Sequence, residues 1–303
     1  MAPYKFKAAG EHATFEWFFL LVDAGKEQGI WAKDGLDPEF VPVAGSSVQL
    51  KERVDAGIKI GFVNTAEVTL ARSNGVPVKT VAGYFGETTA RIFVAANGPI
   101  KTGKDLDGKR IGIVATTHTS YRTVLYMNKT LAIKAEAVPL GNLSNNVAAL
   151  KSGQIDAFYS AEGAALTLVD SGDLRLLLPL SDIYPKPYTA VVVWTTDDLI
   201  EQNPDLVRRF VNATLETVRY LKDHPSYASD LYIKRTHTPR SVADKAVASI
   251  NQILTSSGRG SGQDLVAAVA GNWQFITESG AVPAGTTVKI EEAVDTRFLP
   301  PRP

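Results

Sequence analysis

The chain has 303 residues, of which 45% are hydrophobic and 21% charged, so it is long enough for two domains and has the composition of a soluble globular protein. Its 32 Lys and Arg residues balance 32 Asp and Glu residues, and no basic run exceeds two residues, so neither a nucleic acid nor an anionic membrane is an expected partner. The absence of cysteine excludes a thiol nucleophile, an iron–sulfur cluster and a cysteine zinc site.

The apolar runs and the first residues bear on the compartment of the protein. No apolar run approaches the roughly 18 residues that a membrane-spanning helix needs. The first seven residues lack the apolar core of a secretory signal and lead at once into an expected strand. We therefore expect the chain to begin at the mature N-terminus of an exported protein whose signal peptide has been removed.

The first part of the chain alternates between strand and helix patterns. Strands are expected at 4–9, 37–43, 58–63 and 76–82. Between them, apolar residues recur at helical spacing over 14–26, a second helix ends near Ala56, and a third ends before Gly75. This order predicts a mainly parallel sheet with helices on its faces.

The middle of the chain repeats this rhythm, and the last third is helical. Strands are expected at 90–96, 111–115, 135–138, 155–159, 174–178 and 190–194, with helices from Ser120 and at 145–152 and 161–171. Asn203 followed by Pro204 indicates the start of a long helix that runs to His224. Two more helices are expected over 241–255 and 262–279.

Two apolar segments, 90–96 and 190–194, lie on either side of the second unit. They could serve as paired crossing strands, which would make the second unit an insertion into a discontinuous first domain and the two crossings a hinge. We therefore expect residues 1–92 and 194–303 to form lobe 1 and residues 93–193 to form lobe 2.

The stretch from Asp105 to Arg122 reads as strand, polar loop and helix. Free backbone N–H groups at the start of a helix, together with the side chains of the Thr/His/Thr/Ser loop, present donors that suit an oxyanion or a polar ligand edge. The same residues are explained as a plain N-cap, with Thr119 or Ser120 satisfying the first turn. The sequence leaves both interpretations open.

Five short segments fall in the order seen in solute-binding proteins of ATP-driven importers. They are Gly29–Leu36, Gly75–Lys79, Ile100–Lys101, Asp105–Gly112 and Ala149–Ala157. Over about Tyr4–Leu299 the chain resembles the branch that takes up sulfonates, taurine, nitrate and pyrimidine precursors, which also contains fungal pyrimidine-precursor synthases. Each segment consists mostly of turns and strand starts, so the resemblance rests on their order.

The resemblance implies the type II periplasmic-binding-protein fold, an α/β fold with two Rossmann-like lobes, a two-strand hinge and the ligand in the cleft. It implies capture of a small polar organic ligand, a sulfonate or taurine-like anion or zwitterion, and its delivery to an ABC transporter permease. We expect a monomer without a cofactor, periplasmic or lipid-anchored outside the cytoplasmic membrane. The alternative ligand is a pyrimidine or thiamine precursor or another aromatic heterocycle, and a synthase enzyme or a sensor domain is less favoured.

By position, the resemblance nominates ligand-binding residues where strands end and helices begin. They are His12, Thr14, Phe15, Ser46, Asn64, Thr65, Tyr84, Thr117, His118, Thr119, Ser120, Tyr159 and Glu162. Ser46 and Asn64 are explained equally well as N-caps, Phe15 better as a core residue, and Glu162 equally well as a partner of a helix dipole. Tyr84 and Tyr159 are stronger candidates, because a tyrosine just past a strand end offers a ring face and a hydroxyl together.

Neither catalysis nor a metal site is expected. The synthases among these relatives use a cysteine-rich segment and histidine with iron, and this chain has no cysteine. Its four histidines are His12, His118, His224 and His237, and their spacing matches no metal-ligand motif. We expect an anionic ligand group to be held by N–H groups and hydroxyls at the helix starts after Ser46 and Thr119, aided by protonated histidine, rather than by Arg122.

Overall fold

The computed structural model describes residues 3–11, 16–42, 46–161, 163–260, 264–280 and 282–301. The chain divides into two compact units. Unit 1 comprises Met1–Glu87, Lys186–Trp273 and Thr286–Pro303, and unit 2 comprises Thr88–Pro185 and Gln274–Gly285. The sequence analysis assigned everything after residue 194 to lobe 1, whereas residues 274–285 group with unit 2.

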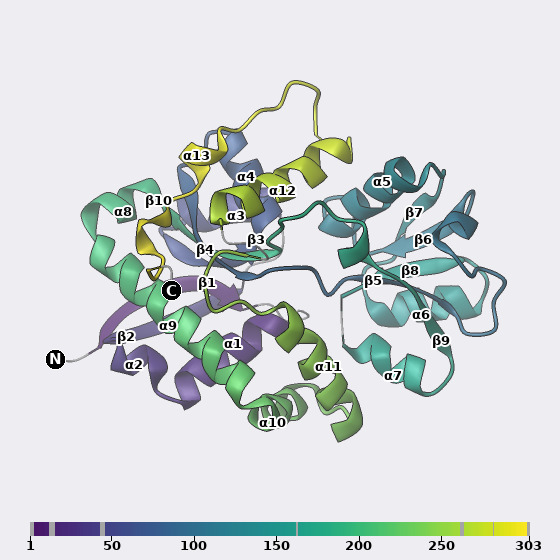
Figure 1. Cartoon of the computed structure of the whole chain (residues 1–303), viewed down its shortest axis with the longest axis horizontal. Helices are drawn as coiled ribbons and strands as arrows, with labels where there is room; N and C mark the ends of the chain where they lie inside the picture. The colour runs from purple at the N-terminus through teal and green to yellow at the C-terminus, as the bar shows by residue number, and fades with distance from the viewer. Residues whose placement is uncertain are drawn as a thin grey trace. The chain divides into compact units, whose positions relative to one another are not determined.

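Unit 1 is built on a mixed five-stranded sheet with the order β2-β1-β3-β10-β4 (Figure 1). Its strands are β1 (Tyr4–Glu11), β2 (Leu36–Pro42), β3 (Ile60–Asn64), β4 (Val78–Phe85) and β10 (Val191–Thr196). β1 pairs in parallel with β2 and β3, and β10 pairs antiparallel with β3 and β4. The expected parallel sheet is therefore interrupted by one antiparallel strand that returns from far along the chain.

Both faces of this sheet are covered, because its central strands are apolar on both sides. In β10, Val191 and Val193 pack into one hydrophobic cluster, and Val192 and Trp194 pack into another on the opposite face. Helices α1 and α9 to α11 contribute to the first cluster, and α3 and α4 contribute to the second. The continuous apolar run of β10 thus reflects a strand buried between two helical layers.

The sequence analysis expected most of the longer helices of unit 1, but not those at 197–202, 225–236 and 290–293. The helices are α1 (Glu16–Glu27), α2 (Ile30–Lys33), α3 (Ser47–Asp55), α4 (Thr65–Ser73), α8 (Asp197–Gln202), α9 (Pro204–Asp223), α10 (Pro225–Thr236), α11 (Arg240–Ile253), α12 (Leu265–Glu278, whose last residues from Gln274 group with unit 2), α13 (Ile290–Ala293) and the 3₁₀ turn η3 (Thr296–Phe298). The start of α9 is as predicted: Pro204 is its first residue, and the Asn203 side chain accepts a hydrogen bond from the Leu206 N–H at 3.1 Å.

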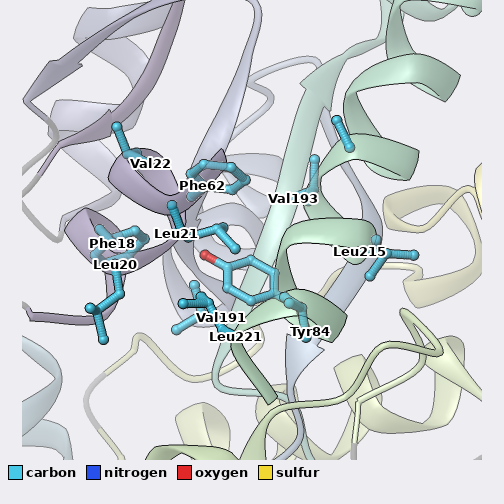
Figure 2. Packing of buried hydrophobic residues seen from close by; sticks show 14 of the residues in the cluster. Phe18, Leu20, Leu21, Val22, Phe62, Tyr84, Val191, Val193, Leu215 and Leu221 are labelled. Atoms are coloured by element: carbon cyan, nitrogen blue, oxygen red, sulfur yellow. The ribbon is translucent and has the colours of Figure 1, made fainter. Parts of the chain in front are cut away.

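The core of unit 1 is rich in aromatic rings. The ring of Phe210 in α9 lies 5.3 Å from the rings of both Trp31 and Phe62, and Phe62 lies 5.6 Å from Tyr84 in an edge-on arrangement. Figure 2 shows side chains of α1, the central strands and α9 meeting around Tyr84. Packing of this kind fixes α1 and α9 on the sheet, because large rings bury much apolar area and have preferred mutual geometry.

Unit 2 repeats the design with a second mixed five-stranded sheet, in the order β7-β6-β8-β5-β9 (Figure 1). Its strands are β5 (Arg91–Ala95), β6 (Arg110–Ile113), β7 (Glu136–Pro139), β8 (Ala157–Ser160) and β9 (Leu174–Pro179). Its helices are α5 (Thr119–Leu131), α6 (Leu143–Lys151) and α7 (Ala164–Asp170), with 3₁₀ turns η1 (Gly103–Leu106) and η2 (Leu180–Asp182). No helix within the described ranges has the length and apolar character needed to cross a membrane.

The prediction that 90–96 and 190–194 pair as crossing strands is wrong. β5 lies inside the sheet of unit 2, antiparallel to β8 and β9. β10 lies inside the sheet of unit 1. Each segment is apolar because it is a central strand of its own sheet. The chain passes between the units outside them, after Glu87, Pro185, Trp273 and Gly285.

Two of the segments that carry the family resemblance meet within unit 2. The Arg110 N–H and its Nε donate to Asp156 Oδ2, at 2.9 and 3.1 Å, and Arg110 Nη2 donates to the Gly153 carbonyl at 2.9 Å. These bonds hold the start of β6 against the turn that precedes β8. Arg110, Gly153 and Asp156 of these two motifs therefore stabilise the sheet.

Candidate functional site

The start of α5 is a polar feature at the carboxyl end of β6 in unit 2. β6 ends at Ile113, and helix α5 begins at Thr119 with His118 as its N-cap. His118 has extended backbone angles, and its ring Nδ1 accepts a hydrogen bond from the Ser120 N–H at 3.1 Å. The predicted caps, Thr119 and Ser120, are thus replaced by the residue before them, because the imidazole nitrogen takes the place of a side-chain oxygen.

Ser120 connects this helix start to the strand that leads into it. Its side chain is fully buried, and its Oγ accepts a hydrogen bond from the Val114 N–H at 3.1 Å. The same Oγ lies 3.0 Å from His118 Nδ1. Ser120 is therefore a structural partner of His118 and not the exposed hydroxyl that the sequence prediction placed in contact with ligand.

Tyr159 lies in β8, and its ring meets the ring of His118 edge-on with centroids 6.3 Å apart. The residue is only 6% exposed, and its hydroxyl forms no hydrogen bond within the part of the chain that the structure describes. Burial raises the pKa of the Tyr159 hydroxyl well above its usual value, and the positive charge of Arg122 partly opposes this rise. The hydroxyl therefore stays protonated and can donate a hydrogen bond at neutral pH.

Arg122 is closer to this group of residues than its place in the sequence indicates. It is buried in the first turn of α5, and its Nη2 donates to Thr119 Oγ1 at 3.3 Å. A helical side chain points back toward the helix N-terminus, so the fourth residue of the helix can bring its charge to the helix start. The expectation that helix starts rather than an arginine hold an anionic group stays a prediction.

The other predicted residues in this loop differ in exposure. Thr117 is exposed in the turn before the cap, and Thr119 is half-buried, with its hydroxyl engaged by Arg122. Together, His118, Tyr159 and Arg122 form what we call the α5 cluster. It lies at the N-terminal end of a 13-residue helix, where the helix dipole is positive.

Unit 1 contributes fewer free polar groups than expected. Ser46 is the N-cap of α3, and its hydroxyl accepts from the Gln49 N–H at 3.2 Å. Thr65 was expected to contact ligand; it is fully buried, and its hydroxyl donates its proton to the Thr189 carbonyl at 2.8 Å. Asn64 ends β3 without making a capping bond, and its half-buried side chain forms no hydrogen bond with described residues.

Tyr84 is buried in the core of unit 1, whereas its position near a strand end predicts a ligand contact. It is 1% exposed, and its ring lies 5.6 Å from Phe62 and 5.3 Å from Phe85. Figure 2 shows the ring among Leu21, Val191 and Leu221. Burial raises the pKa of its hydroxyl well above the usual value. The reason lies in the strand period, which turns Tyr84 toward the face that α1 and α9 cover.

The remaining predicted residues are His12, Thr14, Phe15 and Glu162, which lie outside the described residues. Among the described residues, no three His, Asp or Glu side chains gather closely enough to hold a metal ion.

Comparison with known proteins identifies the family. The sequence pattern of the family described as "NMT1/THI5 like" matches residues 19–228, which is more than half of the chain. The chain belongs to the NMT1/THI5-like family. This confirms the family that the order of motifs indicated.

Three known proteins resemble this NMT1/THI5-like chain, one in sequence and two in structure. It is 26% identical over 181 residues to the riboflavin-binding protein RibY of Chloroflexus aurantiacus, an alignment that covers 59% of this chain and 51% of RibY, about half its length. The aliphatic sulphonate-binding protein SsuA of Escherichia coli superposes with a TM-score of 0.79 at 17% identity, over 97% of this chain and 93% of SsuA. The desulfurization enzyme DszB superposes with a TM-score of 0.65 at 17% identity, over 97% of both chains.

At such identities the structural likeness concerns the fold alone. The predicted periplasmic-binding-protein fold is confirmed, with two α/β units that each contain a mixed five-stranded sheet. The same fold carries binding proteins and at least one enzyme, so the function of this NMT1/THI5-like protein has to be argued from its own residues.

Proposed function

We propose that this NMT1/THI5-like protein is the solute-binding component of an ABC importer and captures a small organic ligand outside the cytoplasmic membrane. Family membership and the periplasmic-binding-protein fold support the proposal. So does the likeness to a relative named as a binding protein. The permease of the importer is then its macromolecular partner, because the solute-binding component hands the ligand to it.

The ligand that fits best carries an acidic group of the sulfonate or carboxylate kind. The observation that carries this choice is the Tyr159 side chain, which is 6% exposed and whose hydroxyl has no hydrogen-bond partner among the described residues, next to the N-cap of α5. The hydroxyl proton is therefore available to an incoming oxygen atom. The dipole of α5 favours an anion at the same place.

A flat heterocycle is the second candidate. The ring of Tyr159 offers an aromatic face as well as a hydroxyl, and RibY is named for binding a flavin, which is a flat heterocycle. A pyrimidine-precursor synthase is less favoured, because synthases of that kind use a cysteine-rich segment and this sequence contains no cysteine.

A thermal-shift panel separates these candidates. The probes are methanesulfonate, taurine, acetate, nitrate, riboflavin and a hydroxymethylpyrimidine, each tested for stabilisation and for chemical turnover. A ligand at about a hundred times its dissociation constant should add roughly 2.7 kcal/mol to the free energy of unfolding. Stabilisation by the sulfonates without turnover supports the proposal, and stabilisation by riboflavin alone favours the second candidate.

The variant Tyr159→Phe tests the observation itself. It removes only the hydroxyl, so the affinity for the sulfonate should fall by about three- to tenfold, the value of one neutral hydrogen bond. Tyr220→Phe is the matched control, because Tyr220 lies in α9, where its ring stacks on His224 with centroids 4.1 Å apart. Unchanged sulfonate affinity in Tyr159→Phe would contradict the assigned ligand class.

A further inference from the structure

The sequence contains the pair Asn-Gly twice, at Asn74-Gly75 and at Asn97-Gly98. In such a pair the backbone nitrogen of the glycine can attack the amide carbon of the asparagine side chain, because glycine has no Cβ to obstruct the approach. Asparagine belongs to the thermolabile residues of proteins. In a folded chain the attack depends on how firmly the amide and the neighbouring backbone are held, since both have to move.

Asn97 lies in a turn that follows β5. The turn closes through a hydrogen bond from the Gly98 N–H to the Ala95 carbonyl at 3.0 Å. Asn97 is exposed, and its side chain makes no hydrogen bond to any residue that the structure describes. Pro99 comes next and has no N–H, so it cannot add a backbone hydrogen bond that would hold the turn. The amide of Asn97 is therefore free to rotate toward the Gly98 nitrogen.

Asn74 follows the last residue of α4, and its amide is tied to that helix. The Asn74 side chain donates through Nδ2 to the Leu70 carbonyl at 2.9 Å. The Gly75 N–H donates to the Arg72 carbonyl at 3.0 Å, and Gly75 takes the left-handed conformation of a helix end, with φ at 81°. Both asparagines are exposed, so hydrogen bonding rather than access to solvent distinguishes them.

We propose that Asn97 is a site of spontaneous deamidation, and that the end of α4 protects Asn74 from the same reaction. The Gly98 nitrogen gives its proton to hydroxide and attacks Cγ of Asn97. The bond from Cγ to Nδ2 breaks, ammonia leaves with a proton from water, and a cyclic imide remains. Water then opens the imide at one of its two carbonyl groups, which yields aspartate or isoaspartate at position 97. Each product carries one more negative charge than the parent, because a carboxylate replaces a neutral amide.

Peptide mapping separates the two sites. Trypsin cleaves after lysine and arginine, so it releases Asn74 in the peptide 73–79 and Asn97 in the peptide 92–101. The native protein is aged in mildly alkaline buffer, and mass spectrometry follows the conversion of amide to acid in each peptide. Digestion in H₂¹⁸O marks any conversion that takes place only during digestion. We expect the peptide 92–101 to convert about tenfold faster than 73–79, because reaction at Asn74 also requires the bond to Leu70 and the helix end to open.

The same measurement in urea tests the physical reason for this difference. Unfolding removes the hydrogen bonds at both sites, so the two peptides should then convert at similar rates. An unchanged ratio of the two rates in urea would mean that the neighbouring sequence, and not the fold, protects Asn74. Equal rates in the native protein, or no conversion of the peptide 92–101, would also overturn the proposal.

Asn97→Gln is the matched control for the chemistry. Glutamine keeps a primary amide in the same turn, but its side chain is one methylene longer and would have to close a larger ring. The peptide 92–101 of Asn97→Gln should therefore stay unconverted while the parent peptide reacts. Equal conversion in both proteins would contradict the attack by the Gly98 nitrogen. This inference does not depend on the proposed function.

Discussion

Replacing Tyr84 by phenylalanine should stabilise the protein. The Tyr84 side chain is 1% exposed, and its hydroxyl is buried without a hydrogen-bond partner among the described residues. Burying a hydroxyl without a partner costs about 1–3 kcal/mol in protein mutational data. Tyr84→Phe removes that cost and keeps the ring contacts with Phe62 and Phe85. We expect the free energy of unfolding to rise by about 1–2 kcal/mol, or the midpoint by roughly 2–8 °C.

Urea and thermal unfolding of the parent and of Tyr84→Phe measure this change in stability. Calorimetry with the ligand found in the thermal-shift panel measures affinity, which should be the same in the two proteins. The matched control is Tyr184→Phe, because the Tyr184 hydroxyl is buried and lies 2.6 Å from Thr123 Oγ1. Removing a satisfied hydroxyl leaves Thr123 with one partner fewer, so this control should lose about 1 kcal/mol.

Two results would refute the reasoning on Tyr84. A loss of ligand affinity in Tyr84→Phe would restore the sequence-based interpretation of this residue as a ligand contact. A loss of stability would mean that the hydroxyl has a partner. A single water is the candidate, because Tyr84 lines a cavity of about 10 Å³, close to the smallest space that holds one.

Three further changes test the fold. Gly61→Ala should destabilise unit 1 by about 3 kcal/mol in urea unfolding. The added Cβ would lie 2.0 Å from the Ala9 carbonyl oxygen and would push β1 away from β3. Parent-like stability would contradict this contact. Burial raises the pKa of Asp156, but hydrogen bonds from Arg110 outweigh it and lower that pKa. Asp156→Asn should therefore lower the free energy of unfolding by about 1 kcal/mol at pH 7. This difference from the parent should shrink as pH falls below about 4, because the parent carboxylate becomes protonated there. A pH-independent difference would argue against the ion pair. Asn203→Ala should lower stability by about 1 kcal/mol through the lost cap of α9, whereas Asn203→Asp should not.

Local signals in the sequence determined most of the elements of this protein. α9 begins where Asn203 and Pro204 place it, because a cap and a first-turn proline act within three residues of each other. The sequence analysis also recognised the strands of both sheets, because most of them are short runs of alternating or continuous apolar residues between turn signals. The order of turns and strand starts was enough to indicate the family and hence the fold.

The neighbours of each strand were decided only by the tertiary structure. β10 lies between β3 and β4, more than a hundred residues away, and β5 lies between β8 and β9. Nothing in either apolar run specifies these partners, because any exposed strand edge offers the same N–H and C=O groups. The prediction that the two runs pair with each other failed for that reason.

Two tyrosines considered for the candidate site show the same contrast between what local sequence determines and what tertiary structure decides. Tyr84 and Tyr159 both stand near the end of an apolar strand, and the sequence gives them the same role. Only the folded chain separates them: helices from distant parts of the sequence close over Tyr84, whereas Tyr159 faces the start of α5 with its hydroxyl unpartnered in the described chain. Local sequence determines which residues stand at a strand end, but burial and hydrogen bonding there depend on packing contacts that form across the whole chain.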